Sequence, residues 1–424
     1  MGLQLQELYP RVVSAHGRHT LHISLCGERG ESVPQIKLIP MEIYDISHAP
    51  DYWSHHADRY EWADLTPCGD GHYTADLAFG SEQRYAVKLR LGEECFYYGY
   101  LYAVEEDLIP LRPFKGDTHV HTNRSDGKDE PFAAACAYRA AGYDFVAITD
   151  HGRYAPSVEL AAELNPLADR FYVMPGEEVH PKGGSYFHII SLGASHSITE
   201  VFERHPEQAQ NAIEEILSTR DLSGLPDPRA AAYRIYIASQ IRSAGGVAVL
   251  THPFWETDGE YNMQPAECVY HMRHSDFDTL EILGGNDDTG NGNNLLEMLW
   301  HQERAQGVTI PVVGSSDCHT VNVWSDYDHF NQQFTLVFAT DRADLLTAIR
   351  EGRTVAVDRR SDKHFRCVGD YRLVKYARFL MAEYYPAHGA LCAAHAAALT
   401  ARDTDALAAA EAAIDAHDAK FYGV

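Results

Sequence analysis

The chain has 424 residues, enough for two or three domains, and its composition of 45% hydrophobic and 23% charged residues is typical of a globular protein. The formal net charge of −26 argues against binding to a nucleic-acid backbone or to an anionic membrane surface. No apolar run reaches the roughly 18 residues that a membrane span needs.

Eight cysteines are scattered along the chain without a Cys-x-x-Cys pair. In a chain of this length, that pattern is typical of reduced thiols inside a cell. The opening stretch MGLQLQELYPRVV has neither the apolar core nor the cleavage site of a signal peptide. We therefore expect a cytoplasmic protein.

Residues 1–112 contain short alternating segments such as TLHISLCGE and QRYAVKLRLG, punctuated by Gly, Pro and Asp. Alternation with a period of two predicts half-buried strands. We expect an antiparallel, sandwich-like β domain here. The segment IPLRPFKG, which holds two prolines, is expected to link it to the next domain.

Residues 113–360 show a different pattern of apolar and polar residues. Apolar strands such as FVAITDH and GVAVLTHP alternate with amphipathic helices such as DEPFAAACAYRAAG, which starts with an acidic stretch and a proline and closes at a glycine. This alternation predicts a parallel α/β architecture, either an open sheet or a barrel. Residues 361–424 are Ala-rich and are expected to form a C-terminal helical segment.

Histidines and carboxylates stand at the ends of these predicted strands. The carboxyl ends of the strands form the active-site face of a β/α barrel. We therefore expect these side chains to meet in one mouth, although they come from distant parts of the sequence. They are His119, His121, His151, Glu177, Glu178, His188, His252, Asp317 and His319.

The local spacings indicate metal binding. In His119-Val120-His121 and Asp317-Cys318-His319, the outer two side chains lie on the same face of an extended strand. One face then offers two ligands to one ion or to adjacent ions. Imidazole and carboxylate without thiolate suit zinc, manganese or iron rather than a structural zinc site built on cysteine.

Together, these motifs resemble those of the PHP (polymerase and histidinol phosphatase) family. The matching elements are HVH…SDG, TDH, GEEV, the His of FHIISLG, THP and SDCH, in the family's order. The resemblance covers about residues 113–360 and implies a distorted barrel of seven β/α units that binds two or three metal ions. The upstream β domain and the segments KGDTHVHT, NNLLEMLWHQERAQG and REGRTVAV are most similar to the branch with carbaryl-hydrolase-like metallohydrolases.

The resemblance also implies a ligand set. Glu178 would bridge two ions, and the Gly-x-Glu-hydrophobic pattern selects it over Glu177. Other members place His where Asp126 stands, which implies a weaker or absent third ion. The implied ligands are His119, His121, Asp126, His151, Glu178, His188, His252, Asp317 and His319.

Residues next to these motifs are candidates for contacts with substrate. Arg124, Arg153 and Lys182 either bind an anionic group or are ordinary solvated charges. Of the histidines outside the motifs, His180 is the strongest candidate because it follows Glu178 closely. Trp255 either lines the pocket or packs in the core.

These observations predict a metal-dependent hydrolase. Its proposed catalytic residues are Glu178, Asp317 and His319, of which Asp317 or His319 would protonate the leaving group. Phosphoester hydrolysis of a small, anionic substrate is the first hypothesis, and hydrolysis of a carboxylic or carbamate ester or an amide is the second. A non-catalytic PHP module is the third, and a homo-oligomer is compatible with all three.

Overall fold

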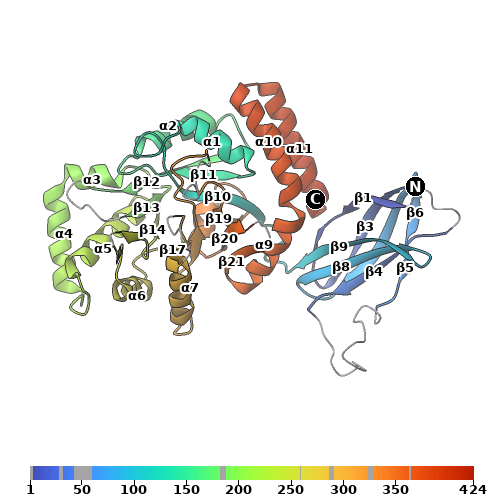
Figure 1. Cartoon of the computed structure of the whole chain (residues 1–424), viewed down its shortest axis with the longest axis horizontal. Helices are drawn as coiled ribbons and strands as arrows, with labels where there is room; N and C mark the ends of the chain where they lie inside the picture. The colour runs from blue at the N-terminus through green and yellow to red at the C-terminus, as the bar shows by residue number, and fades with distance from the viewer. Residues whose placement is uncertain are drawn as a thin grey trace. The chain divides into compact units, whose positions relative to one another are not determined.

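The computed structural model describes residues 3–27, 32–42, 60–181, 188–257, 259–285, 291–322, 329–361 and 364–424. The chain divides into two units (Figure 1). The first unit comprises Met1–Leu111, Arg378–His388 and Ala412–Val424, and the second comprises Arg112–Ala377 and Gly389–Glu411. The predicted boundaries at residues 112 and 360 stay a prediction.

The first unit contains two β-sheets that share one apolar core. Their strand orders are β1-β3-β7-β6 and β2-β9-β8-β4-β5. Leu21 and Ile23 from one sheet and Val87 and Leu89 from the other are buried in the same cluster, as alternation predicts for two sheets packed face to face. The strands are β1 (Gln4–Tyr9), β2 (Val12–Ser14), β3 (Gly17–Cys26), β4 (Gln35–Pro40), β5 (Ala63–Asp64), β6 (Thr66–Gly69), β7 (His72–Phe79), β8 (Gln83–Leu91) and β9 (Glu94–Val104).

The second unit is built on a mixed sheet of ten strands in the described residues, in the order β18-β17-β14-β13-β12-β11-β10-β19-β20-β21. The α/β class is therefore as predicted, and each apolar segment singled out in the sequence forms a strand. These strands are β10 (Arg112–Val120), β11 (Phe145–Ile148), β12 (Tyr172–Val179), β13 (Ile189–Leu192), β14 (Val247–Leu250), β17 (Thr279–Leu283), β18 (Val312–Gly314), β19 (Gln333–Ala339), β20 (Thr354–Ser361) and β21 (His364–Gly369). A two-stranded ribbon, β15 (Glu256–Thr257) with β16 (Glu260–Tyr261), follows β14.

The sheet is not parallel throughout, which differs from the expectation. β13 runs antiparallel to both β12 and β14, and β19 runs antiparallel to β10. Only residues 180–188 connect β12 to β13. Parallel neighbours need a crossover of a dozen or more residues, so this short connection forces the chain to reverse. The entry into β13 therefore lies at the same end of the sheet as the exit from β12.

Side-chain hydrogen bonds bring the two sides of this sheet close to closure. Thr354 Oγ1 on β20 donates to the carbonyl of Val312 on β18 at 2.7 Å, and Thr335 Oγ1 on β19 donates to the carbonyl of Gly314 at 2.7 Å. Just beyond β18, the His121 amide donates to the Cys318 carbonyl at 2.9 Å. The sheet thus curls into a nearly closed barrel.

Helices surround the barrel and begin and end where local sequence directs (Figure 1). Asp227 caps α5 by accepting a hydrogen bond from the Ala230 amide at 2.9 Å, and Gly245, with φ of +80°, follows its end. The helices before the C-terminal segment are α1 (Pro131–Ala140), α2 (Ala155–Leu164), α3 (Ile198–Arg204), α4 (Pro206–Thr219), α5 (Pro228–Ser243), α6 (Pro265–His274), α7 (Asn291–Arg304) and α8 (Leu345–Arg350).

The C-terminal segment is helical, as predicted, with α9 (Tyr371–Glu383), α10 (Tyr385–Ala401) and α11 (Thr404–Tyr422). The expected linker at residues 109–116 is wrong in part. β10 already begins at Arg112, and Pro113 takes a place in the pairing with β19 opposite Phe338. Among the helices in the described part of the chain, none has the length and apolarity required to cross a bilayer.

Candidate metal centre

The residues predicted as ligands lie at one end of the barrel. His119 and His121 stand at the end of β10, His151 follows β11, and His252 follows β14. His188 immediately precedes β13, and it reaches the same end because that strand is reversed. The remaining predicted ligands are Asp126, Glu178, Asp317 and His319, which complete the same group of side chains.

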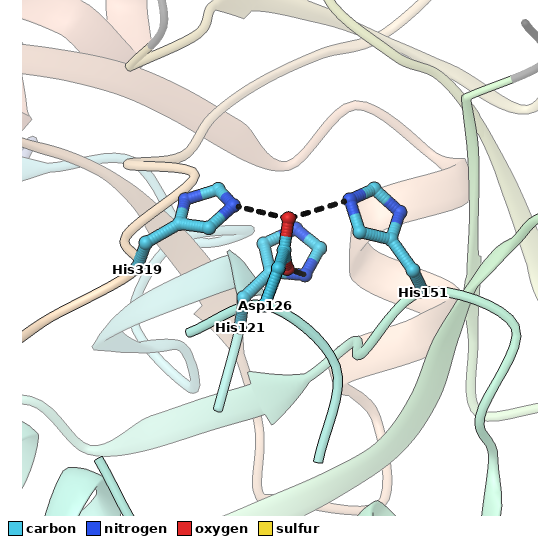
Figure 2. Close-up of side chains that lie close together, drawn as sticks. All are labelled: His121, Asp126, His151 and His319. Carbon is cyan, nitrogen blue, oxygen red and sulfur yellow. Dashed lines mark ion pairs between the residues drawn. The ribbon is translucent and has the colours of Figure 1, made fainter. Parts of the chain in front are cut away.

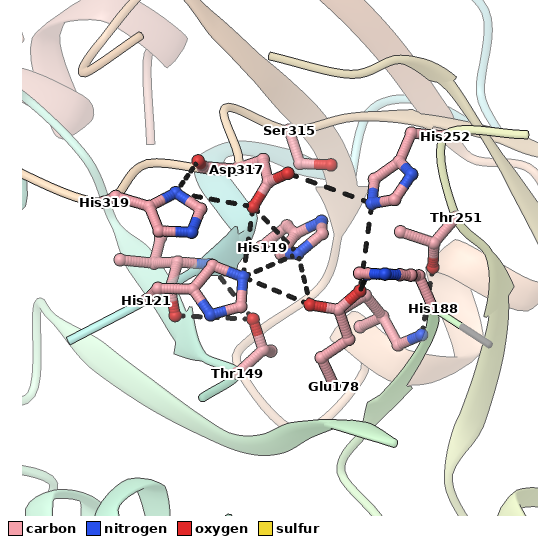
Figure 3. Close-up of polar contacts among 12 residues, drawn as sticks. His119, His121, Thr149, Glu178, His188, Thr251, His252, Ser315, Asp317 and His319 are labelled. Carbon is pink, nitrogen blue, oxygen red and sulfur yellow. Dashed lines mark hydrogen bonds and ion pairs between the residues drawn. The ribbon is translucent and has the colours of Figure 1, made fainter. Parts of the chain in front are cut away.

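The centre of this group holds four donor atoms at short mutual distances (Figure 3). His119 Nε2 lies 3.0 Å from His121 Nε2, and each of these nitrogens lies 3.2 Å from Glu178 Oε2. Asp317 Oδ1 lies 3.1 Å from His119 Nε2 and 3.0 Å from His121 Nε2. All four side chains are buried. We call these four residues the inner set.

The second oxygen of Glu178 faces a different pair of histidines. Glu178 Oε1 lies 2.6 Å from His188 Nδ1 and 3.8 Å from His252 Nε2. Asp317 Oδ2 lies 3.8 Å from the same nitrogen of His252. Glu178 thus presents one oxygen to the inner set and one to this second set, which is the arrangement of a carboxylate that bridges two ions.

Asp126 lies at the centre of a third set (Figure 2). Its Oδ2 lies 3.5 Å from His151 Nε2 and 3.4 Å from His319 Nε2, while its Oδ1 lies 3.7 Å from His121 Nδ1. The Asp126 side chain is 54% exposed, whereas the Glu178 side chain is fully buried. This outer set is therefore the most open to solvent of the three.

The spacing of the donor atoms is compatible with shared metal ions. Neighbouring ligands held about 2.0–2.1 Å from one ion lie roughly 2.8–3.4 Å apart in octahedral or tetrahedral geometry. The inner set, at 3.0–3.2 Å, has this spacing. His252 is 6% exposed, yet neither of its ring nitrogens makes a hydrogen bond. A bound metal ion would account for buried ring nitrogens that make no hydrogen bond.

The pKa values show how strongly the site attracts cations. Burial opposes a charge on His119, but Asp317, Glu178 and Glu281 raise its pKa well above the usual value. Burial also opposes a charge on His121, but hydrogen bonds and charge from Asp317 and Glu178 raise its pKa to about 9. Burial would raise the pKa of Glu178, yet the neighbouring histidines hold it well below its usual value. With protons as the only cations, the inner set pairs protonated His119 and His121 with the carboxylates of Asp317 and Glu178, and metal ions would replace those protons.

The backbone at two of the predicted ligands is strained. His252 has φ of +21° and Asp317 has φ of +52°, a region that residues with a side chain rarely adopt. Such conformations persist where the surrounding structure holds them, and they concentrate at functional sites. This strain supports a functional role for the two residues.

Three buried carboxylates that the sequence reading did not single out hold the ligand segments. Asp150 accepts hydrogen bonds from the amide and the hydroxyl of Thr122, both at 2.7 Å, and so fixes the loop before Asp126. Asp117 accepts from Ser316 Oγ at 2.5 Å, and Glu281 contacts His119. Their only sequence signal is a carboxylate inside or next to an apolar strand.

The other candidates occupy varied positions. Arg124 is paired with Glu130 at 3.0 Å on the surface, and Arg153 is exposed. Lys182 lies outside the described residues. The His180 ring lies 5.3 Å from the His151 ring, and the Trp255 ring lies 5.4 Å from the rings of His188 and His252. His180 and Trp255 therefore border the cluster.

Comparisons with known proteins give weak similarities. No family model and no curated protein matches the chain. One similar solved structure is a two-domain protein from Bacteroides vulgatus with a predicted PHP-like metal-dependent phosphoesterase, at 16% identity and a TM-score of 0.39, covering 58% of this chain and 65% of that one. The match thus spans just under two thirds of that protein.

Two further solved structures are similar over 48% of this chain and 87% of their own. One is a proposed metal-dependent phosphoesterase from Bifidobacterium adolescentis, at 17% identity and a TM-score of 0.34. The other is an amidohydrolase from Chromobacterium violaceum, at 18% identity and a TM-score of 0.33. Because all three scores are below 0.5, assignment of the site depends on its own geometry.

Proposed function

We propose that this chain is a metal-dependent hydrolase of the PHP type that acts on phosphoesters of small anionic molecules. The observation that carries the proposal is the position of Glu178, whose two oxygens face separate groups of histidine nitrogens. A buried carboxylate in that position is suited to holding two ions close together. Two or three zinc, manganese or iron ions are the cofactors that this donor set favours.

The ligand residues would have different roles towards the bound ions. Divalent ions at such a site supply a Lewis acid and, at neutral pH, a hydroxide nucleophile. The carboxylates of Glu178 and Asp317 would compensate the positive charge of the ions. The histidine nitrogens would complete the ligand sets and so fix the positions of the ions. The burial of the inner set limits the access of bulk water, which strengthens electrostatic interactions with charge that develops on a substrate.

His319 is our candidate for the residue that transfers a proton to the leaving group. Its side chain is 34% exposed, and its Nδ1 lies 2.8 Å from the carbonyl oxygen of Asp317. Because a carbonyl oxygen only accepts, Nδ1 carries a hydrogen in this contact. Nε2 then faces Asp126 in the outer set, and it would transfer a proton only while no third ion is bound there.

Carbonyl ester or amide hydrolysis is the second candidate, and one feature favours it. The indole of Trp255 lies beside His188 and His252, so one side of the cluster is aromatic. Arg124, by contrast, is engaged by Glu130 rather than directed at the cluster. An apolar acyl or leaving group would suit that aromatic side.

A paired assay distinguishes the two hydrolase reactions. An aryl phosphate and an aryl carboxylate ester with the same leaving group are compared for wild type, Arg124→Ala and Arg153→Ala. A phosphoesterase turns over the phosphate faster and is inhibited competitively by inorganic phosphate. It loses about 1.5–3 kcal/mol of transition-state stabilisation for each charge-assisted contact removed. Faster turnover of the carboxylate, without phosphate inhibition, would reject the phosphoesterase reading and favour the alternative.

The third possibility, a PHP module without catalytic activity, predicts no turnover of either ester by metal-loaded protein. All nine predicted ligand side chains lie in one group, which argues against a module without catalytic activity. Such a module does not need a complete set of side chains that bind metal ions. A cytoplasmic location and a homo-oligomeric assembly stay predictions.

A further inference from the structure

Glu281 is a buried carboxylate on β17, the strand between β14 and β18 in the sheet. The neighbouring strands β14 and β18 lead into predicted ligands, but β17 carries none. Its Glu281 side chain is fully buried, in the interior of the site. A buried carboxylate is costly unless several donors satisfy it, so its partners indicate its role.

Three ligand-bearing segments meet at this carboxylate. Glu281 Oε1 lies 3.1 Å from His119 Nδ1 and also accepts a hydrogen bond from Ser315 Oγ, two residues before Asp317. Glu281 Oε2 accepts a hydrogen bond from the His252 backbone amide at 2.7 Å. The end of β10 and the segments that follow β14 and β18 are thus linked to one side chain.

The contact with His119 determines which ring nitrogen is available for a metal. An ionised carboxylate only accepts hydrogen bonds, so the hydrogen between Glu281 and His119 sits on Nδ1. In the neutral ring that a metal ion requires, the other nitrogen, Nε2, then has its lone pair available and faces the inner set. A histidine ligand is commonly oriented in this way by a carboxylate outside the ion's own ligands.

The contact with His252 fixes a strained backbone. His252 has φ of +21°, and its amide is held by Glu281 Oε2. Without that acceptor, the rarely adopted conformation of the peptide loses a hydrogen bond that stabilises it. The same carboxylate therefore orients one predicted ligand through its ring and a second through its backbone.

We propose that Glu281 is a positioning residue of the metal centre, which sets the tautomer of His119 and holds the strained peptide of His252 for ion binding. This inference rests on the proposed metal-dependent function and names a residue outside the predicted ligand set. Glu281 does not itself need to contact substrate or ion.

The isosteric substitution Glu281→Gln tests this role sharply. The amide keeps the volume of the carboxylate but has one oxygen and one NH₂ group. If NH₂ faces the His252 amide, two donors oppose each other. If NH₂ faces His119, the hydrogen must move to Nε2, where it blocks the nitrogen that faces the inner set. Either orientation disrupts a contact that Glu281 satisfies.

Glu177→Gln is the matched control, because Glu177 is also fully buried and accepts hydrogen bonds from Ser197 Oγ at 3.0 Å and from the Ile198 amide. It contacts no predicted ligand side chain in these bonds. Both variants and the wild type are stripped of metal and titrated with Zn²⁺ against a competing chelator, with thermal unfolding measured in parallel. We expect a roughly 10–100-fold lower zinc affinity for Glu281→Gln. The control should lose thermal stability while its zinc affinity stays near that of the wild type.

Several outcomes overturn the proposal. Wild-type affinity in folded Glu281→Gln, or an equal loss of affinity in Glu177→Gln, would show that Glu281 is an ordinary structural residue. Wild-type protein that binds none of zinc, manganese and iron would instead reject the metal-dependent function itself. If Glu281→Gln does not fold, ¹⁵N shifts of zinc-loaded wild type decide the matter: His119 should carry a protonated Nδ1, and zinc bound through Nδ1 would refute the inference.

Discussion

Glu177 and Glu178 are adjacent in the sequence, but their carboxylates face opposite sides of β12. Glu178 Oε2 lies 3.2 Å from His119 Nε2, whereas Glu177 Oε2 accepts a hydrogen bond from Ser197 Oγ, the residue that caps α3. Period-two alternation along a strand produces this separation. One carboxylate belongs to the candidate metal centre and the other to the start of a helix.

This separation predicts different consequences for two substitutions. Glu178→Ala should lose bound metal and activity together, because it removes the carboxylate shared by the inner and second sets. Glu177→Ala should keep its metal and lose about 1–3 kcal/mol of stability, because it leaves buried donors of α3 without an acceptor. Elemental analysis and denaturant unfolding of both proteins measure this. The reverse pattern would mean that the register of β12 is shifted by one residue.

The second prediction concerns Asp126. Its set is the most exposed of the three, so the ion that it binds should be the weakest. If the third ion position is filled in the wild type, Asp126→Ala should lose that ion and keep the two others. If the position is not filled under the assay conditions, the variant should bind the same two ions as the wild type. Glu130→Ala is the control, since it removes an exposed carboxylate from the same segment. Loss of all ions from Asp126→Ala would show that the three sets are not separable.

The third prediction is that metal binding releases protons. The pKa of His121 is raised to about 9 with protons as the only cations, so both of its ring nitrogens carry a proton at neutral pH. An ion that binds through the same nitrogen displaces that proton, and apparent affinity should therefore rise with pH toward about 9. Calorimetric titration in buffers with different ionisation enthalpies counts the protons. Identical heats in all buffers would contradict the prediction.

Much of this site was predictable because its signals are local. The pair His119/His121 stands at the end of an apolar strand, and the strand period places both side chains on one face. Asp317 and His319 lie beyond the end of β18, and Asp317 has φ of +52°, so the extended conformation expected for that pair is wrong, although both side chains reach the site. The antiparallel direction of β13 was not predictable from its apolar run, since a buried parallel strand and a buried antiparallel strand read alike. Glu281 was not predicted for a related reason. Its three partners come from distant segments of the chain, and no local sequence pattern relates them to one another.

The fourth prediction lies outside the site. Burial, followed by the charge of Arg359, lowers the pKa of Lys115 from 10.5 to about 7. Between these two values the unfolded chain binds more protons than the folded one, so the free energy of unfolding should rise with pH by up to about 1.4 kcal/mol per unit. The Lys115 ammonium lies 3.9 Å from the centre of the Tyr143 ring, which favours the charged form and makes this slope an upper bound.

Lys115→Met should remove this dependence. Unfolding curves of both metal-loaded proteins, measured from neutral to alkaline pH, should diverge steadily as the wild type gains stability relative to the variant. Parallel pH profiles would show that the ammonium is fully compensated by its hydrogen bonds to the Ala141 carbonyl and to Asn331 Oδ1.

The central claim is that His119, His121, Glu178 and Asp317 hold a metal ion and that Glu178 shares a second ion with His188 and His252. Anomalous diffraction from crystals of metal-replete protein, collected on both sides of the absorption edge of each metal, tests this claim directly. We predict at least two anomalous peaks per chain, one amid the inner set and one on the other side of the Glu178 carboxylate. A single peak, or none, would contradict the bridged metal centre.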